Sequence, residues 1–361
     1  MVESLAAIGW NDRIAELFEP LFERGLSAGR VVRVDGQTSL VATNETSIRA
    51  EASRGILEDP AGSVKLPAVG DWVALRPRKD HPVAVVEAVL PRTSAITRIR
   101  RGDMNVRDVQ VLAANIDAVF IVQAVNNVNI RLLEREVVQV WESGATPAIV
   151  LTKGDLVDDA SPAAASVEPV AGGARVHVAS GITGDGMESL VEYTQSGRTI
   201  ALIGASGVGK STLANWLLGG EVLATSAVRA HDGRGRHTTT ARYLVAIPGG
   251  GALIDTPGLR SLGVLDSEEG ISKVFADIEN LAVECRFRDC GHESEPGCAV
   301  TGAIDEGVLD EDRLADMRKL ERELAHQRRK GDPSTRADAR RRQQANARSR
   351  RVTEKLERKA K

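Results

Sequence analysis

The spacing of apolar residues divides the chain into segments of different character. Residues 11–24 carry apolar side chains at helical intervals and predict a short helix within a leading segment, residues 1–28. Residues 29–102 contain five β-rich runs broken by turns: RVVRVDG, TSLVAT, SIRAEA, GDWVALRP and PVAVVEAVLP. Strands this short and this closely spaced predict a small β-barrel, for which the OB type is the leading candidate.

From about residue 103 the pattern changes to continuous apolar strands that alternate with helices or loops. Six such runs follow one another: DAVFIVQAV, TPAIVLTKGDL, ARVHVASG, RTIALIG, ARYLVAIPGG and GALIDTPGL. Continuous apolar strands are typical of sheets that helices cover on both faces. We therefore expect a mostly parallel, doubly wound α/β domain over residues 103–265, followed by a small, mainly helical region over residues 266–325.

Charge is unevenly distributed along the chain. The net charge is −3, yet residues 326–361 hold 14 Lys and Arg against 4 Asp and Glu, a balance of +10 that leaves −13 for the rest. A tail rich in arginine and poor in apolar residues is expected to be disordered when free and to bind a polyanion.

The composition also limits the class of protein. No apolar run approaches the roughly 18–20 residues that span a bilayer, and the N-terminus lacks the basic-then-apolar pattern of a secretion signal. We expect a cytoplasmic protein. The three cysteines are an odd number and lie between Cys285 and Cys298, which favours metal ligation over disulfides.

The stretch TIALIGASGVGKST predicts a phosphate-binding loop. Gly204, Gly209, Lys210 and Ser211 fit the pattern G-x-x-x-x-G-K-[ST] between a predicted strand and a predicted helix. Backbone N–H groups and the helix N-terminus would bind phosphate oxygens, Lys210 would reach the β- and γ-phosphates, and Ser211 would ligate Mg²⁺. The residues expected to contact the nucleotide here are Gly204, Ala205, Ser206, Gly207, Val208, Gly209, Lys210, Ser211 and Thr212.

Two further segments are typical of nucleotide hydrolases. In LIDTPG, Asp255 ends a strand and would hold Mg²⁺ through water, and the N–H group of Gly258 would meet the γ-phosphate. In GRGRHTTTARYL, a threonine among residues 238–240 would complete the Mg²⁺ shell, with Thr239 and Thr240 as candidates. The glycines and arginines at its start predict a mobile switch.

The base is expected to be guanine. Asp155 in TKGD can accept hydrogen bonds from both N1 and N2 of guanine, whereas adenine offers no such pair of donors. Lys153 would cover the base with its aliphatic stem. In VAS, which follows the next strand, Ala179 and Ser180 would present backbone N–H groups to guanine O6.

These motifs come in an unusual order, with the base-selecting pair before the phosphate loop. The sequence resembles the RsgA family of circularly permuted GTPases over nearly its whole length, on the motifs quoted above and on ECRFRDCGHESEPGCAV. The resemblance implies an OB-like barrel, a permuted GTPase domain and a zinc-binding region. It also implies a monomeric GTPase that assists late maturation of the small (30S) ribosomal subunit. Such a protein binds rRNA with GTP bound, is stimulated by the subunit and leaves after hydrolysis.

Two positions depart from the usual pattern. Thr152 stands where the base-selecting motif usually has asparagine, and a hydroxyl can make fewer contacts to the phosphate loop, so guanine affinity is expected to be moderate. Leu259 stands where many GTPases have the glutamine that orients the attacking water. The resemblance assigns that catalytic role to His237 and predicts slow turnover that a partner raises.

The cysteine cluster predicts a structural zinc site. Its C-x4-C-x-H-x5-C pattern would supply three thiolates and one imidazole to a closed tetrahedral shell: Cys285, Cys290, His292 and Cys298. The resemblance to the RsgA family makes this prediction specific, because the spacing differs from that of commoner zinc knuckles.

RNA is the expected partner of the barrel, the zinc region and the basic tail. Trp72 is the one aromatic residue between residues 29 and 101, so recognition is expected through phosphates and RNA shape rather than base stacking. The candidate contacts are Arg76, Arg78, Lys79, Arg98, Arg100 and Arg101. Two other functions remain open: a phosphotransferase or ATPase that uses the same loop, and a non-catalytic RNA-binding module with a regulatory guanine-nucleotide site.

Overall fold

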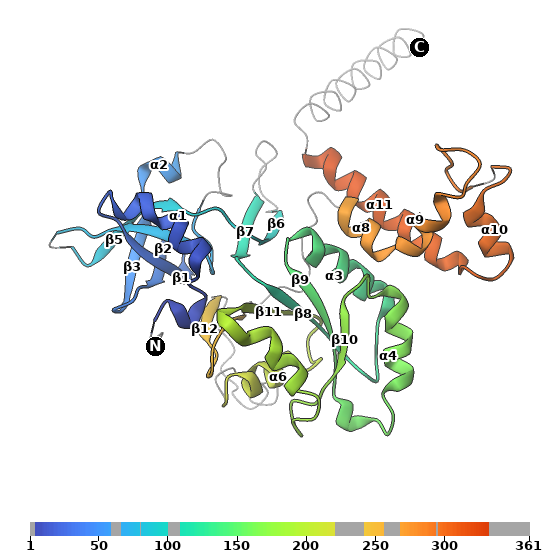
Figure 1. Cartoon of the computed structure of the whole chain (residues 1–361), viewed down its shortest axis with the longest axis horizontal. Helices are drawn as coiled ribbons and strands as arrows, with labels where there is room; N and C mark the ends of the chain where they lie inside the picture. The colour runs from blue at the N-terminus through green and yellow to red at the C-terminus, as the bar shows by residue number, and fades with distance from the viewer. Residues whose placement is uncertain are drawn as a thin grey trace, which may run out of the picture.

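The computed structural model describes residues 4–58, 66–79, 81–99, 109–220, 242–255, 268–293 and 295–331. Figure 1 shows a β-barrel and a group of C-terminal helices at opposite ends of the molecule, with a central α/β domain between them. None of the helices in the described ranges is both long enough and apolar enough to cross a membrane.

The N-terminal region is the predicted small barrel. Its five strands pair in the order β1-β2-β3-β5-β4, and β4 returns to β1. This closed arrangement of five short strands confirms the OB-like barrel. The elements are η1 (Ala6–Ile8), α1 (Asp12–Phe22), β1 (Ser27–Asp35), β2 (Thr38–Ala42), β3 (Ser47–Ala52), α2 (Arg54–Leu57), β4 (Trp72–Arg76) and β5 (Val83–Val89).

Helix α1 packs against β1 and β4 on the outside of the barrel. It begins where the side chain of Asn11 accepts a hydrogen bond from the N–H group of Ile14 at 3.1 Å. Phe18 of α1 is buried and packs on Trp10, which in turn meets Trp72 edge-on at 5.4 Å between ring centroids. Trp72 is therefore part of the core, and its ring is not available to stack on a base.

The central domain is the predicted doubly wound sheet. Its strands are β8 (Ala118–Ala124), β9 (Thr146–Thr152), β10 (Arg175–Val178), β11 (Thr199–Ile203), β12 (Tyr243–Ala246) and β13 (Ala252–Asp255). They lie in the order β10-β9-β8-β11-β13-β12, and all are parallel except β12, which runs antiparallel to β13. The prediction of a mostly parallel sheet is confirmed.

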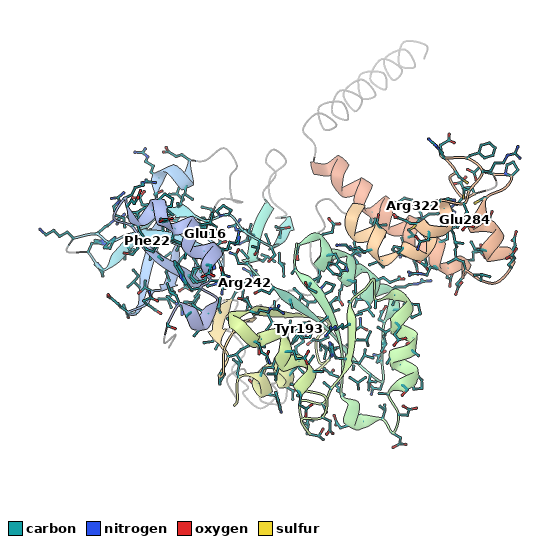
Figure 2. All side chains as sticks on the ribbon, in the orientation of Figure 1. Glu16, Phe22, Tyr193, Arg242, Glu284 and Arg322 are labelled. Atoms are coloured by element: carbon teal, nitrogen blue, oxygen red, sulfur yellow. The ribbon has the colours of Figure 1, made fainter. Side chains whose placement is uncertain are left out.

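Helices cover both faces of this sheet because its strands are apolar at consecutive positions. Val119 and Ile121 face the core beneath α3 (Ile130–Glu142) and α4 (Ser161–Val167). Phe120 and Val122 face the core beneath α5 (Glu188–Val191) and α6 (Lys210–Leu217). On this second face Tyr193 of η5 (Glu192–Gly197) packs edge-on against Phe120, with 5.3 Å between ring centroids (Figure 2). Two short helices, η3 (Gly154–Leu156) and η4 (Glu168–Val170), complete the domain.

The barrel and the central sheet are hydrogen-bonded to each other. Strand β12 pairs antiparallel with β1 at Arg33 and Tyr243, which joins the two into one eleven-stranded sheet. A separate hairpin, β6 (Ala95–Ile99) and β7 (Val109–Ala114), spans the domain boundary expected at residues 102–103. The two domains thus share backbone pairing that the sequence pattern did not predict.

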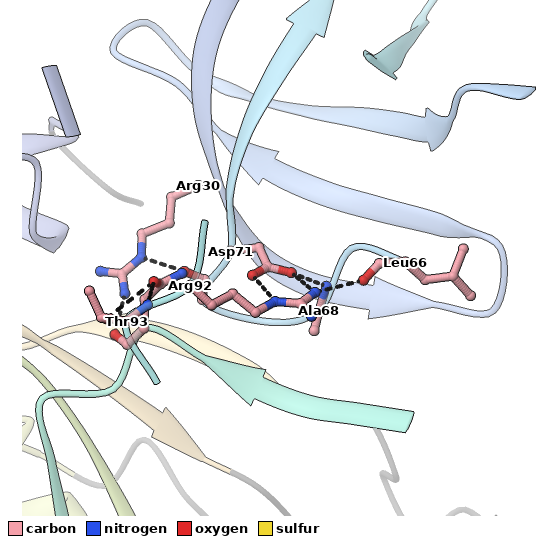
Figure 3. Close-up of polar contacts among 8 residues, drawn as sticks. Arg30, Leu66, Ala68, Asp71, Arg92 and Thr93 are labelled. Carbon is pink, nitrogen blue, oxygen red and sulfur yellow. Dashed lines mark hydrogen bonds and ion pairs between the residues drawn. The ribbon is translucent and has the colours of Figure 1, made fainter. Parts of the chain in front are cut away.

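A buried arginine connects three chain segments where the barrel meets the α/β domain. Arg30 of β1 is 2% exposed and donates hydrogen bonds to the backbone carbonyls of Ile8, Gly70 and Asn115. Beside it, Asp71 receives a bidentate ion pair from Arg92, with both N···O distances 2.7 Å (Figure 3). Three chain segments therefore converge on one side chain.

The described residues of the C-terminal region form four helices: α8 (Glu268–Val274), α9 (Ala276–Ala282), α10 (Ala299–Asp305) and α11 (Glu311–Gly331). Figure 2 places Glu284 and Arg322 in this region, away from the barrel. Helix α8 packs on α3, where the N–H group of Gly270 donates to the Glu142 carboxylate at 2.8 Å. Helix α11 runs to Gly331 and so extends past the boundary expected at residue 325.

Candidate nucleotide site and metal centre

The predicted nucleotide-binding segments meet at one edge of the central sheet. Strands β9, β10, β11 and β13 run parallel and end at Thr152, Val178, Ile203 and Asp255. The carboxyl ends of parallel strands are the usual place for a ligand in a doubly wound sheet. The fold thus brings together the two base-selecting segments, the phosphate loop and the carboxyl end of β13, although these segments are distant along the chain.

The phosphate loop approaches its neighbours so closely that two of its glycines are required. Gly204 has φ +132°, and a Cβ atom there would lie 2.2 Å from the carbonyl oxygen of Val122. Gly209 has φ +100° and would place a Cβ atom 3.3 Å from the hydroxyl of Thr152. Any other residue would push the loop away from β8 and β9.

The loop leads directly into α6, so the N-terminus of this helix lies at the phosphate loop. Leu213 donates to the carbonyl of Gly209, which begins the helical hydrogen bonding. The Lys210 ammonium group donates to the carbonyl of Gly204 at 2.8 Å and to that of Ala205, so it lies across the loop. A cation and a helix N-terminus at one point make a site for phosphate groups.

Thr152 connects the base-selecting segment to the phosphate loop. Its hydroxyl is buried, donates to the carbonyl of Gln123 at 3.1 Å, and also contacts the carbonyl of Val208 inside the loop. A hydroxyl has one proton to share between these two acceptors. Threonine therefore keeps the connection that the usual asparagine makes, through fewer hydrogen bonds.

The two base-selecting loops hold each other through side chain and backbone. The Ser180 hydroxyl donates to Asp155 Oδ1 at 2.6 Å, and the N–H group of Gly154 donates to the carbonyl of Ala179 at 3.3 Å. Ser180 is buried, whereas Asp155 is exposed. Lys153 has φ +61°, a left-handed conformation that turns the chain sharply after β9. The Asp155 carboxylate is thus oriented at the rim of the site.

One carboxyl group near the loop was not anticipated. Glu136 of α3 is 5% exposed, and burial raises its pKa to about 7, against the opposing field of Lys210 and a hydrogen bond from Gln123. The sequence carries a signal for it, because Glu136 falls three residues after Leu133 and four before Val140 on the apolar side of the helix.

Several predicted site residues lie outside the described residues. These are His237, Thr238, Thr239, Thr240, Gly258 and Leu259. Their roles in catalysis and in Mg²⁺ binding stay predictions. Of the predicted Mg²⁺ ligands, Ser211 lies in the first turn of α6, and Asp255 is the last residue of β13.

The three cysteines and His292 come together in the C-terminal region. Their ligand atoms all lie within 4.8 Å of one another. His292 Nδ1 is 3.6 Å from Cys285 Sγ and 3.4 Å from Cys298 Sγ, and these two sulfurs are 3.9 Å apart. A tetrahedral zinc ion with bonds of about 2.3 Å to sulfur and about 2.0 Å to nitrogen separates its ligand atoms by roughly 3.5–3.8 Å. The donor set and its dimensions therefore fit zinc.

Cys298 also begins α10. Its sulfur accepts a hydrogen bond from the N–H group of Thr301 at 3.4 Å. Burial alone would raise the pKa of Cys298, but this hydrogen bond and those with Thr301 Oγ1 and His292 lower the pKa to about 6. A thiol that ionises readily is a good ligand for a metal ion.

The predicted RNA contacts on the barrel are partly engaged with acidic neighbours. Arg76 pairs with Glu87 at 2.8 Å, and Arg78 lies 3.9 Å from Glu51. Lys79 is exposed, and Arg98 belongs to β6. Arg100, Arg101 and the tail from residue 332 onward lie outside the described residues.

Comparison with protein families gives one clear match. The family model described as RsgA GTPase matches residues 89–265. A protein of Streptomyces coelicolor named small ribosomal subunit biogenesis GTPase RsgA is 45% identical over 341 residues, which is 93% of this chain and 91% of that protein. A protein of the same name from Opitutus terrae is 40% identical over 91% of this chain and 92% of its own length.

Solved structures agree in architecture. The crystal structure of YjeQ from Thermotoga maritima superimposes with a TM-score of 0.59 at 25% identity, covering 83% of this chain and 99% of that one. YloQ, described as a circularly permuted GTPase, superimposes with a TM-score of 0.55 at 25% identity, covering 83% of this chain and 96% of its own.

Proposed function

This chain belongs to the RsgA family of circularly permuted GTPases, and we propose that it binds and hydrolyses GTP as an assembly factor of the small ribosomal subunit. The observation that carries the proposal is the contact between Thr152 and the carbonyl of Val208. It places the guanine-selecting segment against the phosphate loop, so one nucleotide can engage both.

Each group has a defined task in this proposal. Asp155, oriented by Ser180, accepts the two guanine hydrogens, and Lys153 covers the base. Lys210 and the N-terminus of α6 balance the charge of the phosphates. Mg²⁺ would supply further positive charge to the phosphates; Ser211 and one of Thr239 and Thr240 would ligate it, and Asp255 would hold it through water.

Hydrolysis depends on a polar group that orients the attacking water. Leu259 cannot do so, and we assign the task to His237. Slow intrinsic turnover that a partner raises is expected, because no glutamine orients the water. The small ribosomal subunit would be that partner, with Zn²⁺ supporting the C-terminal region and the basic tail contacting rRNA.

Nucleotide selectivity tests the base-selecting role of Asp155. The chain is expected to bind GTP more tightly than ATP by roughly a hundredfold or more, because two hydrogen bonds to a carboxylate contribute about 1.5–3 kcal/mol each. An Asp155→Asn variant should lose GTP and gain XTP, whose 2-oxo group accepts from an amide. Competition against a fluorescent GDP analogue measures all three affinities.

Asp158→Asn provides the matched control. Asp158 is exposed three residues further along the same loop, and its replacement should leave the preference for GTP unchanged. Equal affinity for GTP and ATP in the unaltered chain would contradict the guanine site and favour an ATPase or phosphotransferase instead.

A further inference from the structure

Glu136 is a buried carboxyl group to which nucleotide binding and hydrolysis, as described above, give no role. It lies on the face of α3 that packs on the sheet, between the buried residues Leu133 and Val140. The carboxyl group shares a hydrogen bond with the side chain of Gln123 on β8. Its Oε2 atom has no hydrogen-bonding partner among the described residues. The ionised form of Glu136 is therefore stabilised by one hydrogen bond and by the electric field of nearby charged groups.

Gln123 connects Glu136, through hydrogen bonds, to the residues that contact the phosphate loop. The Gln123 amide also exchanges hydrogen bonds with the backbone of Asn129, and its backbone carbonyl accepts from Thr152. Thr152 contacts the phosphate loop at Val208. Glu136 is therefore two hydrogen-bonded residues away from the loop that would hold the phosphates.

Lys210 is the cation that acts on Glu136. Its positive field favours the ionised carboxylate. Two further cations of the described residues that pack against α3 face elsewhere: Lys273 of α8 lies over the ring of Trp141, and Arg313 of α11 pairs with Glu134. Arg131 and Arg135 of α3 itself pair with Asp316 and Glu323. Strands β8 and β9 carry no ionisable side chain.

We propose that Glu136 makes nucleotide binding proton-linked: when guanine-nucleotide phosphates occupy the loop beside Lys210, the Glu136 carboxylate takes up one proton from solvent. The inference rests on the proposed function, since it requires phosphates at this loop. The anionic phosphates offset the positive field of Lys210 and repel the Glu136 carboxylate. Because Oε2 of this buried carboxylate has no hydrogen-bond donor among the described residues, nothing there compensates the ionised form.

The direction of the effect follows from this change of field. Without nucleotide, burial holds the pKa of Glu136 at about 7. We expect the net negative charge at the loop to raise the carboxyl pKa by roughly one to two units, since the effective dielectric constant inside a protein is about 20. Nucleotide binding is then favoured when Glu136 is protonated, so affinity rises as pH falls through 7. The expected gain is roughly fivefold to tenfold between pH 8 and pH 6.

Titration calorimetry of Mg²⁺–GDP into the full chain tests the proposal. At pH 7, in buffers of different ionisation enthalpy such as PIPES and Tris, the slope of the observed enthalpy gives the protons exchanged. The unaltered chain should take up roughly 0.4 proton more than the Glu136→Gln variant. Comparison with the variant cancels the protonation of the nucleotide itself.

His177→Gln is the matched control. His177 is half-buried on β10, hydrogen-bonds Ser189 and Tyr193, and has a pKa lowered by burial, so it is a second titratable group whose pKa the fold shifts. Its replacement should leave the proton uptake unchanged. If the unaltered chain and Glu136→Gln both bind GDP and take up equal numbers of protons, the proposed role of Glu136 is wrong, while the proposed function stands. Failure of the unaltered chain to bind GDP would overturn the proposed function.

Unfolding by urea gives an independent readout that needs no nucleotide. A carboxyl group with a raised pKa in the folded state destabilises the fold progressively as pH rises from about 4.5 to 7. Glu136→Gln should therefore be more stable than the unaltered chain at pH 8, and the two should converge near pH 5. A difference that stays constant with pH would contradict titration of Glu136 in this range.

Discussion

The barrel and the C-terminal helices each meet the α/β domain at an arginine, buried in the case of Arg30 and half-buried in the case of Arg313, and the two arginines are neutralised differently. Arg30 donates only to backbone carbonyls, from three separate segments. Arg313 of α11 donates to the carboxylates of Asp277 and Glu134, and to the carbonyl of Val274 at 2.7 Å. The Arg30 junction therefore relies on hydrogen bonds to backbone carbonyls, whereas the Arg313 junction relies mainly on ion pairs.

The difference extends to the surroundings of each junction. Burial lowers the pKa of Arg30 to about 10, against the fields of Asp117 and Asp71, so it remains charged at neutral pH. Its junction also shares the backbone pairing between β1 and β12. The Arg313 junction has no strand pairing in the described residues, and burial raises the pKa of its partner Glu134 despite the arginine. We therefore expect the barrel to be held firmly on the α/β domain. The attachment of the C-terminal region is expected to depend on the ion pairs of Arg313.

Removing the metal should have the largest effect, and only on the C-terminal side. The region around Cys285 and Cys298 contains few large apolar residues, so zinc ligation is expected to supply much of its stability. A zinc chelator, used with Mg²⁺ in excess, should expose residues 268–331 to proteases while the affinity for GDP stays the same. Limited proteolysis with mass spectrometry reads the first and fluorescence titration the second.

A Cys290→Ser variant should reproduce the effect of the chelator without adding one. If the purified chain held no stoichiometric metal and resisted proteases equally with and without chelator, the four-ligand site would be wrong.

Arg30→Met should have the next largest effect. The variant leaves the carbonyls of Ile8 and Asn115 buried without this donor, and the loss of unfolding free energy should be on the order of 4 kcal/mol. Chemical denaturation measures it. Arg49→Ala, an exposed arginine on β3, serves as control and should change stability by less than about 0.5 kcal/mol. A small effect of Arg30→Met would contradict its role as the centre of the junction.

Arg313→Met should have a smaller and more local effect. Its side chain is 10% exposed and Asp277 is 42% exposed, so water compensates part of the loss, and about 2 kcal/mol is expected. Hydrogen exchange should increase in α8 and α9 while the barrel strands stay protected.

Arg131→Ala removes the ion pair between Arg131 of α3, whose side chain is exposed, and Asp316 of α11. It should cost less than about 1 kcal/mol and leave exchange unchanged. Equal increases of exchange in barrel and C-terminal helices after Arg313→Met would show that the two junctions are not independent.

The sequence predicted the elements of this fold better than their pairing. The six apolar runs are strands, and Gly204, Gly209 and Lys210 lie where the loop pattern requires them. This succeeded because strand, loop and helix signals are local. The pairing of Arg33 with Tyr243 joins segments far apart in the chain, and no local pattern specifies it.

Buried charges were the other part that could not be predicted in full. Arg30 lies on the same buried face of β1 as Val32, which packs in the core shared with the α/β domain, but an arginine in a strand is normally assigned to the surface. Its role depends on three carbonyls from distant segments. Glu136 could have been found from its helical spacing, whereas the absence of a second partner for its carboxylate in the described residues depends on packing.

The most direct test of the account is GTP turnover by the purified full chain, alone, with small ribosomal subunits and with large ribosomal subunits. The account predicts slow turnover alone, strong stimulation by small subunits, and none by large ones, with a Lys210→Ala variant inactive throughout. Turnover that stays equally slow with both subunits would contradict a subunit-activated GTPase, and would favour an RNA-binding protein whose nucleotide site is only regulatory.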